Sequence, residues 1–325
     1  MILKAYRLTA WYPTLIALVM GLAQTLSWAQ APSSSTPSQQ EPTKHRLSLG
    51  GLSVEIETHL DRLTKHFGPR FDRSAMVSSI QVNGQELVGP WGLADEFGLH
   101  GLGVLGFDEA IEGEAFVKIG VGRLVKDQSK PYAFSHAYPI DQLFPVETVV
   151  NDHEVSVIQQ TPKESPWAYR YEKTYRLRSD QRLEIHYALT NLAEQSIEVE
   201  HYNHHWFLDP NQPVGPSYGV VTHFDLPPRD TGLIYQPRSL VVPNKLEDGE
   251  AQYYASDLVG LSSMMSQFEW QLSAQTQVRF QSSKPITRFA LYADLDGFCP
   301  EMFTRHTIEP QQTVRWSGTY HFTSD

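Results

Sequence analysis

The chain has 325 residues, of which 26 are Lys or Arg and 37 are Asp or Glu, so its formal net charge is −11. A surplus of negative charge repels the phosphate backbone of nucleic acids, and no basic cluster in the sequence offsets it. The composition therefore excludes nucleic acid as the expected partner, and it disfavours anionic polysaccharides.

The N-terminal residues 1–31 have the pattern of a secretory leader. Lys4 and Arg7 supply positive charge, a largely apolar run follows, and Ala29 and Ala31 have the spacing of a cleavage site. The alternative is an uncleaved anchor, but the run is short for a bilayer span of about 20 apolar residues. We therefore expect an exported protein, periplasmic or secreted, with no stable membrane insertion once the leader is removed.

Residues 32–44 form a stretch of mainly Pro, Ser, Thr and Gln, which we expect to be a flexible linker because it cannot bury apolar surface. The remaining residues, 45–325, are expected to form one domain. Cys299 is the only cysteine, so an internal disulfide is impossible. No thiol-enzyme motif surrounds Cys299, and we expect a small buried side chain there.

Alternating apolar and polar residues recur along the predicted domain, and turn-forming pairs such as Asn83-Gly84 and Asp296-Gly297 separate them. No segment has a sustained helical period. The alternating segments are 52–58, 77–82, 169–177, 183–189, 197–200, 278–281 and 314–322. This pattern predicts an all-β fold, a large antiparallel sandwich.

The run from Phe116 to Arg123 contains two glycines in a strand-like context. It lacks the spacing of a phosphate-binding loop, so the glycines are expected to allow a bulge or a close backbone approach. Lys118, within this run, is expected to face a binding site.

The densest run of polar and aromatic residues is 198–207. If this run is extended, one face begins apolar and should look toward the core; it carries Ile197, Val199, His201, Asn203 and His205. The opposite face carries Glu198, Glu200, Tyr202, His204 and Trp206. Carboxylates, an imidazole and aromatic rings could line an open groove that holds a sugar.

Two other interpretations of these histidines stay open. Each could simply be hydrogen-bonded or solvated. A metal site is disfavoured, because His201 and His205 lie four residues apart, which is roughly 13 Å along a strand and too far for one ion. We therefore predict no metal and no cofactor.

Glu301 is a second candidate, since it follows a proline and lies between apolar residues. A carboxylate in such a setting is suited to proton transfer. The alternative is a surface carboxylate paired with Arg305.

Four segments, taken in this order, resemble the galactose mutarotase-like superfamily, which includes the aldose 1-epimerases. They are RFDRSAMV from Arg70, FVKIGVG from Phe116, NHHWF from Asn203, and PEMF from Pro300 with its following IEP and WSGTY. The resemblance implies a large antiparallel β-supersandwich covering the predicted domain. It also implies that His204 is the general acid and Glu301 the general base.

The sequence departs from the family pattern in two places. Phe97-Gly-Leu-His100-Gly is the nearest counterpart of the segment that carries the family's second catalytic histidine. The aspartate that binds sugar hydroxyls in the family has no match. The chain therefore resembles a divergent branch.

The resemblance implies a carbohydrate-binding protein of the aldose 1-epimerase type, an isomerase that interconverts sugar anomers by acid–base ring opening. The expected substrate-binding residues are Tyr202, Trp206, Glu200, Lys118, Arg73 and His100. A non-catalytic carbohydrate-binding protein on the same scaffold is one alternative. A glycan hydrolase or lyase is another, for which Glu200 and Glu301 would have to lie about 5–9.5 Å apart.

Overall fold

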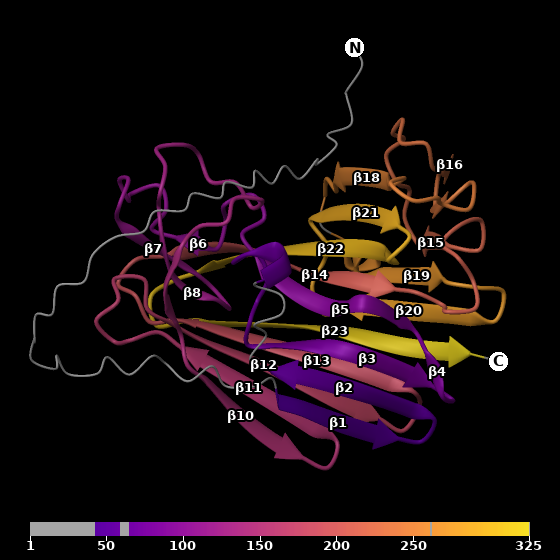
Figure 1. Ribbon diagram of the computed structural model, residues 1–325, viewed down its shortest axis with the longest axis horizontal. Coiled ribbons are helices and arrows are strands. Elements are labelled where there is room, and N and C mark those ends of the chain that lie inside the picture. The colour runs from indigo at the N-terminus through magenta and orange to yellow at the C-terminus, as the bar shows by residue number, and fades with distance from the viewer. Residues whose placement is uncertain (1–42, 59–64, 261, 325) are drawn as a thin grey trace, which may run out of the picture. The chain divides into compact units, whose positions relative to one another are not determined.

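The computed structural model of the protein describes residues 43–58, 65–260 and 262–324 (Figure 1). These residues belong to one compact unit, Gln40–Asp325. The predicted leader, and the predicted linker up to residue 42, lie outside the described residues. Within the described ranges, no helix has the length and apolar character needed to span a membrane.

The described residues form three antiparallel sheets, joined mostly by turns and loops. The nine-stranded sheet contains, in spatial order, β1 (Thr43–Leu49), β2 (Leu52–Thr58), β3 (Ala75–Val82), β5 (Val88–Phe97), β14 (Ile197–Phe207), β22 (Gly297–Ile308), β21 (Arg288–Asp294) and β18 (Gln252–Asp257), with β4 (Gln85–Glu86) beside β3. Strand β14 therefore lies between β5 and β22, near the middle of this sheet (Figure 1).

The ten-stranded sheet packs against the nine-stranded one. Its order is β10 (Val146–Asn151), β11 (Glu154–Gln160), β12 (Tyr169–Arg178), β13 (Arg182–Asn191), β23 (Thr313–Ser324), β20 (Thr276–Ser282), β19 (Gln267–Gln271), β15 (Gly219–Thr222), β17 (Ser239–Val241) and β16 (Ile234–Gln236). A short 3-10 helix, η1 (Ser263–Ser266), precedes β19. The four-stranded sheet contains β6 (Val104–Leu105), β7 (Ala115–Lys118), β8 (Gly122–Val125) and β9 (Ile140–Leu143).

The alternation of apolar and polar residues in the sequence corresponds to an alternation of buried and partly exposed side chains in the strands. Along β13 every second side chain is buried, and β2 has the bounds predicted from its pattern. Buried residues of both large sheets, such as Val54, Ile185 and Trp270, belong to one hydrophobic cluster. The sandwich core is thus the layer between the two large sheets, as an antiparallel fold with one buried face per sheet requires.

The turn at Asn83-Gly84 illustrates the local chemistry. Asn83 has a φ of 51° and Gly84 a φ of 85°, and the two residues connect β3 to β4. Both angles lie in the left-handed region that Asn and Gly tolerate best, as the favoured two-residue hairpin turn demands.

Strand β1 begins at Thr43, two residues before the boundary that we predicted for the domain. Thr43 and Lys44 pair with Thr58 and Glu57, and the Lys44 ammonium lies 2.6 Å from the Glu55 carboxylate. Backbone pairing at a sheet edge needs no apolar side chain. Two polar residues can therefore belong to a strand, although their composition alone predicted a linker.

The junction of β14 and β22 has an unusual centre. The two strands pair from Ile197 to His201 against Thr304 to Ile308, and again at Phe207 against Phe298. Between these points β22 contains Pro300, which has no N–H to donate. The Nδ1–H of His205 donates instead to the Pro300 carbonyl at 2.5 Å. The candidate site lies at this interruption.

Candidate functional site

The two faces of β14 are divided as the alternation predicts. His201, Asn203 and His205 point into the layer between the large sheets, where they meet Asp95 and Tyr320. Tyr202, His204 and Trp206 lie on the other face. That face is also covered, because only 1%, 4% and 7% of these three residues is exposed. Of the side chains predicted to line the groove, Tyr202, His204 and Trp206 are therefore buried, whereas Glu198 is exposed.

His204 and Glu301, the predicted acid and base, meet across β14 and β22. The His204 Nε2 lies 3.0 Å from the Glu301 Oε1, and both side chains are buried. The Cys299 Sγ lies 2.7 Å from the other ring nitrogen of His204, Nδ1, and 3.8 Å from the Glu301 Oε1. Cys299 and Glu301 are two residues apart on β22, so both side chains leave the same face of the strand.

The Cys299 thiol is held in its neutral form. Burial, reinforced by the negative charge of Glu301, raises the pKa of the thiol well above its usual range. The S–H group can therefore donate a hydrogen bond near neutral pH, either to the imidazole or to the carboxylate. The expectation of a small buried cysteine is confirmed, but its contact with His204 was not predicted.

Aromatic rings surround this trio. Trp206 stacks on the His204 ring with centroids 4.6 Å apart, and Phe71 meets the same ring edge-on at 5.5 Å. Tyr202 stacks on Phe303 at 4.3 Å. The indole Nε1 of Trp206 is buried and has no hydrogen-bond partner among the described residues. An unpaired buried donor costs free energy, and a ligand oxygen that reached this nitrogen would find a free N–H.

A charged cluster centred on Glu96 adjoins Tyr202. The Tyr202 hydroxyl donates to Glu96 at 2.5 Å, and Arg70 donates to Glu96 at 2.9 Å and to the Tyr202 oxygen at 3.0 Å. Lys118 approaches the same carboxylate at 3.5 Å and donates to the Tyr132 hydroxyl at 2.8 Å. Burial lowers the pKa of Lys118 to about 8, although Glu96 opposes the shift.

The other predicted binding residues, Glu200, His100 and Arg73, have contacts with other partners. The Glu200 carboxylate is 2.7 Å from His100 Nδ1 and 3.7 Å from Arg305. The alternative pairing of Arg305 with Glu301 is therefore not the one observed. Arg73 is buried, and its backbone N–H donates to the carbonyl of Gly120 at 2.9 Å.

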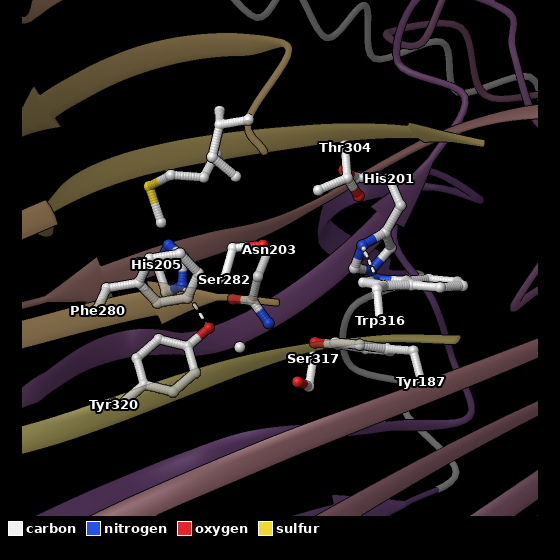
Figure 2. A pocket seen from close by; sticks show the side chains of 13 residues that line it. Tyr187, His201, Asn203, His205, Phe280, Ser282, Thr304, Trp316, Ser317 and Tyr320 are labelled. Atoms are coloured by element: carbon white, nitrogen blue, oxygen red, sulfur yellow. Dashed lines mark hydrogen bonds between the residues drawn. The ribbon is translucent and has the colours of Figure 1, made fainter. Parts of the chain in front are cut away.

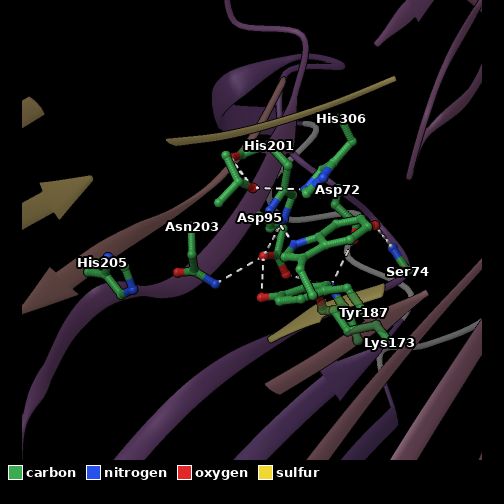
Figure 3. A network of polar contacts seen from close by, with 12 residues as sticks. Asp72, Ser74, Asp95, Lys173, Tyr187, His201, Asn203, His205 and His306 are labelled. Atoms are coloured by element: carbon green, nitrogen blue, oxygen red, sulfur yellow. Dashed lines mark hydrogen bonds and ion pairs between the residues drawn. The ribbon is translucent and has the colours of Figure 1, made fainter. Parts of the chain in front are cut away.

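Behind the site, on the core side of β14, a polar network joins the two large sheets (Figure 3). Asp95 accepts from Lys173 and the Tyr187 hydroxyl at 2.8 Å each, from His201 at 3.0 Å and from Asn203 at 3.1 Å. Lys173 also donates to Asp72 at 2.8 Å and to a backbone carbonyl. The network fixes β14 relative to the opposite sheet.

The charges of this network compensate one another. Burial alone would raise the pKa of Asp95, but the Lys173 ammonium and the hydrogen bond from His201 outweigh it and hold the pKa well below its usual range. Burial lowers the pKa of His205 to about 3, which keeps its ring neutral. His205 can then donate to Pro300 through Nδ1 and accept from the Tyr320 hydroxyl through Nε2 at 2.8 Å.

A cavity of about 30 Å³ also lies on the core side of β14 (Figure 2). His201, Asn203, His205 and Tyr320 line it, and the Asn203 Oδ1 is buried without a hydrogen-bond partner among the described residues. A polar space of this size suits about one water molecule and is too small for a sugar.

Sequence analysis did not predict that the side chains of Glu96 and Arg70 belong to the site. It also did not predict the contact between Cys299 and His204. The adjacent acids Asp95 and Glu96 in an otherwise apolar strand are the signal that could have found the first, because neighbouring strand residues point to opposite faces. The two-residue spacing of Cys299 and Glu301 could have placed the thiol beside the carboxylate.

No protein-family model matches the chain, and no curated protein matches it. Solved structures do match, over 87% to 90% of this chain for the three that follow. A galactose mutarotase related enzyme from Lactobacillus acidophilus has 14% identity, a TM-score of 0.55 and coverage of 87% of this chain and 99% of that chain. A GalM/aldose epimerase homologue from C. elegans has 13% identity, a TM-score of 0.55 and coverage of 87% and 99%. The galactose 1-epimerase of Lactobacillus acidophilus NCFM has 10% identity, a TM-score of 0.53 and coverage of 90% and 97%.

These likenesses show that the chain has the galactose mutarotase-like β-sandwich fold. The fold predicted from strand alternation and from the four motifs is thereby confirmed. Identities of 10% to 14% leave the chemistry to be argued from the side chains.

Proposed function

We propose that this protein binds a sugar at the His204–Glu301 pair and interconverts its anomers by acid–base ring opening. The carrying observation is the 3.0 Å contact between His204 Nε2 and Glu301 Oε1 inside a buried site walled by aromatic rings. An imidazole and a carboxylate at this distance can handle the two protons that ring opening moves. From residues 1–31, we further propose that the protein works outside the cytoplasm.

Ring opening starts from a protonated His204 and an ionised Glu301. Glu301 takes the proton of the anomeric hydroxyl while His204 Nε2 gives its proton to the ring oxygen. The bond between the anomeric carbon and the ring oxygen breaks, leaving an open aldehyde. After rotation about the C1–C2 bond, the hydroxyl attacks the carbonyl from the other face and both protons return, so the protein is regenerated.

Cys299 would hold the imidazole in position during these steps. When His204 is protonated, Nδ1–H can donate to the Cys299 sulfur, and the S–H can donate to Glu301 Oε1. This arrangement leaves Nε2–H directed toward the carboxylate, where the reacting oxygens of a sugar would enter. Cys299 is thus proposed as a positioning residue.

The surrounding residues suit sugar binding. Trp206 offers an apolar ring face, and its unpaired Nε1–H could donate to a hydroxyl. Tyr202, Arg70 and Lys118 gather around Glu96 and supply donors and acceptors for further hydroxyls. Glu200 is paired with His100 and approached by Arg305, which makes it a poorer partner for Glu301 in a hydrolase.

The test is the rate of mutarotation of a panel of aldoses, followed by polarimetry, with wild type and Glu301→Gln. We expect wild type to accelerate at least one aldose and Glu301→Gln to lower kcat/KM by about 10²-fold. Glu198→Gln is the matched control, since Glu198 is exposed on the same strand. Sugar binding without any acceleration by wild type would favour the non-catalytic alternative, and an unchanged rate in Glu301→Gln would refute the proposed base.

A further inference from the structure

The trio of His204, Cys299 and Glu301 has a second chemical property, independent of sugar chemistry. Imidazole nitrogen, thiolate sulfur and carboxylate oxygen are the three kinds of protein ligand that zinc binds. One ligand atom from each residue lies within 4.8 Å of the others, and all three residues are buried. Among the described residues this is the one cluster of three such ligands.

We propose that this trio is a binding site for a soft divalent cation, with Zn²⁺ as the defining probe. A zinc ion lies about 2.0–2.3 Å from its ligand atoms, so atoms that share one ion are about 3–4 Å apart. The Glu301 Oε1 is 3.0 Å from His204 Nε2 and 3.8 Å from the Cys299 Sγ. Two sides of the ligand triangle therefore already have the required length. The third side, from the His204 ring to the Cys299 Sγ, is within 4.8 Å, and the imidazole must turn one nitrogen toward the ion when the ion binds.

Each strand that carries a ligand is held by its outer neighbour, because β14 pairs with β5 at His204 and β22 pairs with β21 at Glu301. His204 lies between β5 and β22 in the sheet, and its ring is stacked on Trp206. Three protein ligands leave one coordination position open for water or another oxygen, as in zinc sites that are not purely structural. Binding would release the thiol proton, because the thiolate is the ligand form of cysteine.

The cation would use the same lone pairs as the proposed acid–base chemistry. A ring nitrogen and a carboxylate oxygen bound to zinc cannot exchange protons with a sugar. Zinc should therefore inhibit mutarotation reversibly, and this consequence rests on the proposed function. The existence of the cation site rests on the geometry alone.

Cobalt absorption provides the direct test. Co²⁺ is titrated into the whole protein, and a thiolate-to-cobalt charge-transfer band is sought. Because Cys299 is the only cysteine, such a band can arise from this site alone. We expect the band with one equivalent of cobalt, its loss in Cys299→Ser, and its displacement by Zn²⁺.

Calorimetric titration with Zn²⁺ then compares the variants. Losing a direct ligand should cost at least as much as losing an outer-shell partner, so Cys299→Ser and His204→Asn should each weaken zinc binding by about tenfold or more. His153→Gln, in an exposed turn, should leave the affinity unchanged. Circular dichroism verifies that each variant is folded.

The outcomes separate the two proposals. Absence of the thiolate band in wild type, or equal zinc affinity in wild type and Cys299→Ser, would overturn the cation site. Zinc binding in a protein that accelerates no aldose would leave the cation site standing and remove the proposed isomerase. Suppose that zinc at a concentration that fully displaces the cobalt band leaves the rate of mutarotation unchanged. This result would refute the idea that the cation and the acid–base chemistry use the same atoms of His204 and Glu301.

Discussion

The two faces of β14 hold similar side chains in contrasting states. On the core face, Asp95 has four donors around it, and Lys173 joins it to Asp72. On the site face, His204 and Glu301 are paired mainly with each other and with a thiol, and Trp206 has an unpaired donor. One strand thus separates a dense network around Asp95 from a smaller set of contacts around His204, and each face has one atom, Asn203 Oδ1 or Trp206 Nε1, that is unpaired among the described residues. Burial alone therefore does not separate the proposed site from a structural network, because the groups on both faces are buried.

The largest effect is expected on the core face. Lys173→Met removes the cation between Asp72 and Asp95 and leaves two buried carboxylates without that positive charge. The free energy of unfolding should fall by about 3–5 kcal/mol, measured by urea denaturation. A loss below about 1 kcal/mol would contradict the view that this network stabilises the sandwich. Lys44→Met, which removes an exposed ion pair, is the control and should change stability by less than about 1 kcal/mol.

On the site face the expected effect is on rate. His204→Asn should slow mutarotation by about 10²-fold, and its combination with Glu301→Gln should be little slower than the slower single variant. The reason is that an acid and a base act in one step, so removing either one already removes most of the rate enhancement that the pair provides. Polarimetry with a shared aldose measures all three variants. Multiplicative losses in the double variant would mean that the two residues act in separate steps.

The pH dependence of the free energy of unfolding tests the core face of β14 through His205. The pKa of His205 is about 3 in the folded protein and 6.5 ordinarily, so only the unfolded state gains a proton between these values. Its stabilising contribution is complete above pH 6.5 and falls as the pH drops toward 3, by up to about 1.4 kcal/mol per pH unit. Urea denaturation at pH 7, 6, 5 and 4 measures this slope. A flat profile would contradict a neutral, buried His205.

The smallest effect is expected from Trp206→Phe. The change keeps an aromatic ring beside His204 and removes the unpaired indole N–H. If that group donates to a sugar hydroxyl, the Kd for the sugar should rise by about threefold to tenfold, the worth of one hydrogen bond. Stability should hold or rise slightly, because a buried unpaired donor is lost. Calorimetry gives the Kd and thermal unfolding gives the stability; an unchanged Kd would exclude the indole N–H from binding.

Local periodicity predicted the sheets and the division of β14 into two faces, because side-chain direction in a strand depends only on neighbours along the chain. The roles of His204 and Glu301 were predicted from the resemblance of their motifs to the aldose 1-epimerases, and periodicity added only the face on which His204 lies. It could not place the Cys299 thiol against His204, since that contact depends on the register of strands 95 residues apart. It also could not predict that Lys173, on the opposite sheet, compensates Asp95. How far a strand face is covered depends on such distant packing, so alternation alone could not predict that Tyr202, His204 and Trp206 are buried.

The interruption of pairing at Pro300 has an evolutionary consequence. In an unbroken antiparallel ladder, opposite residues are held at Cα spacings of about 4.5–5.5 Å, and every pair along the strands shares that lattice. Where β22 has Pro300, the His205 side chain contacts its carbonyl, and backbone pairing between β14 and β22 no longer sets the distance between these two strands, although each still pairs with its outer neighbour. Selection can therefore resize the space between His204 and Glu301 by exchanging side chains there, while the paired ends of both strands keep the sandwich intact.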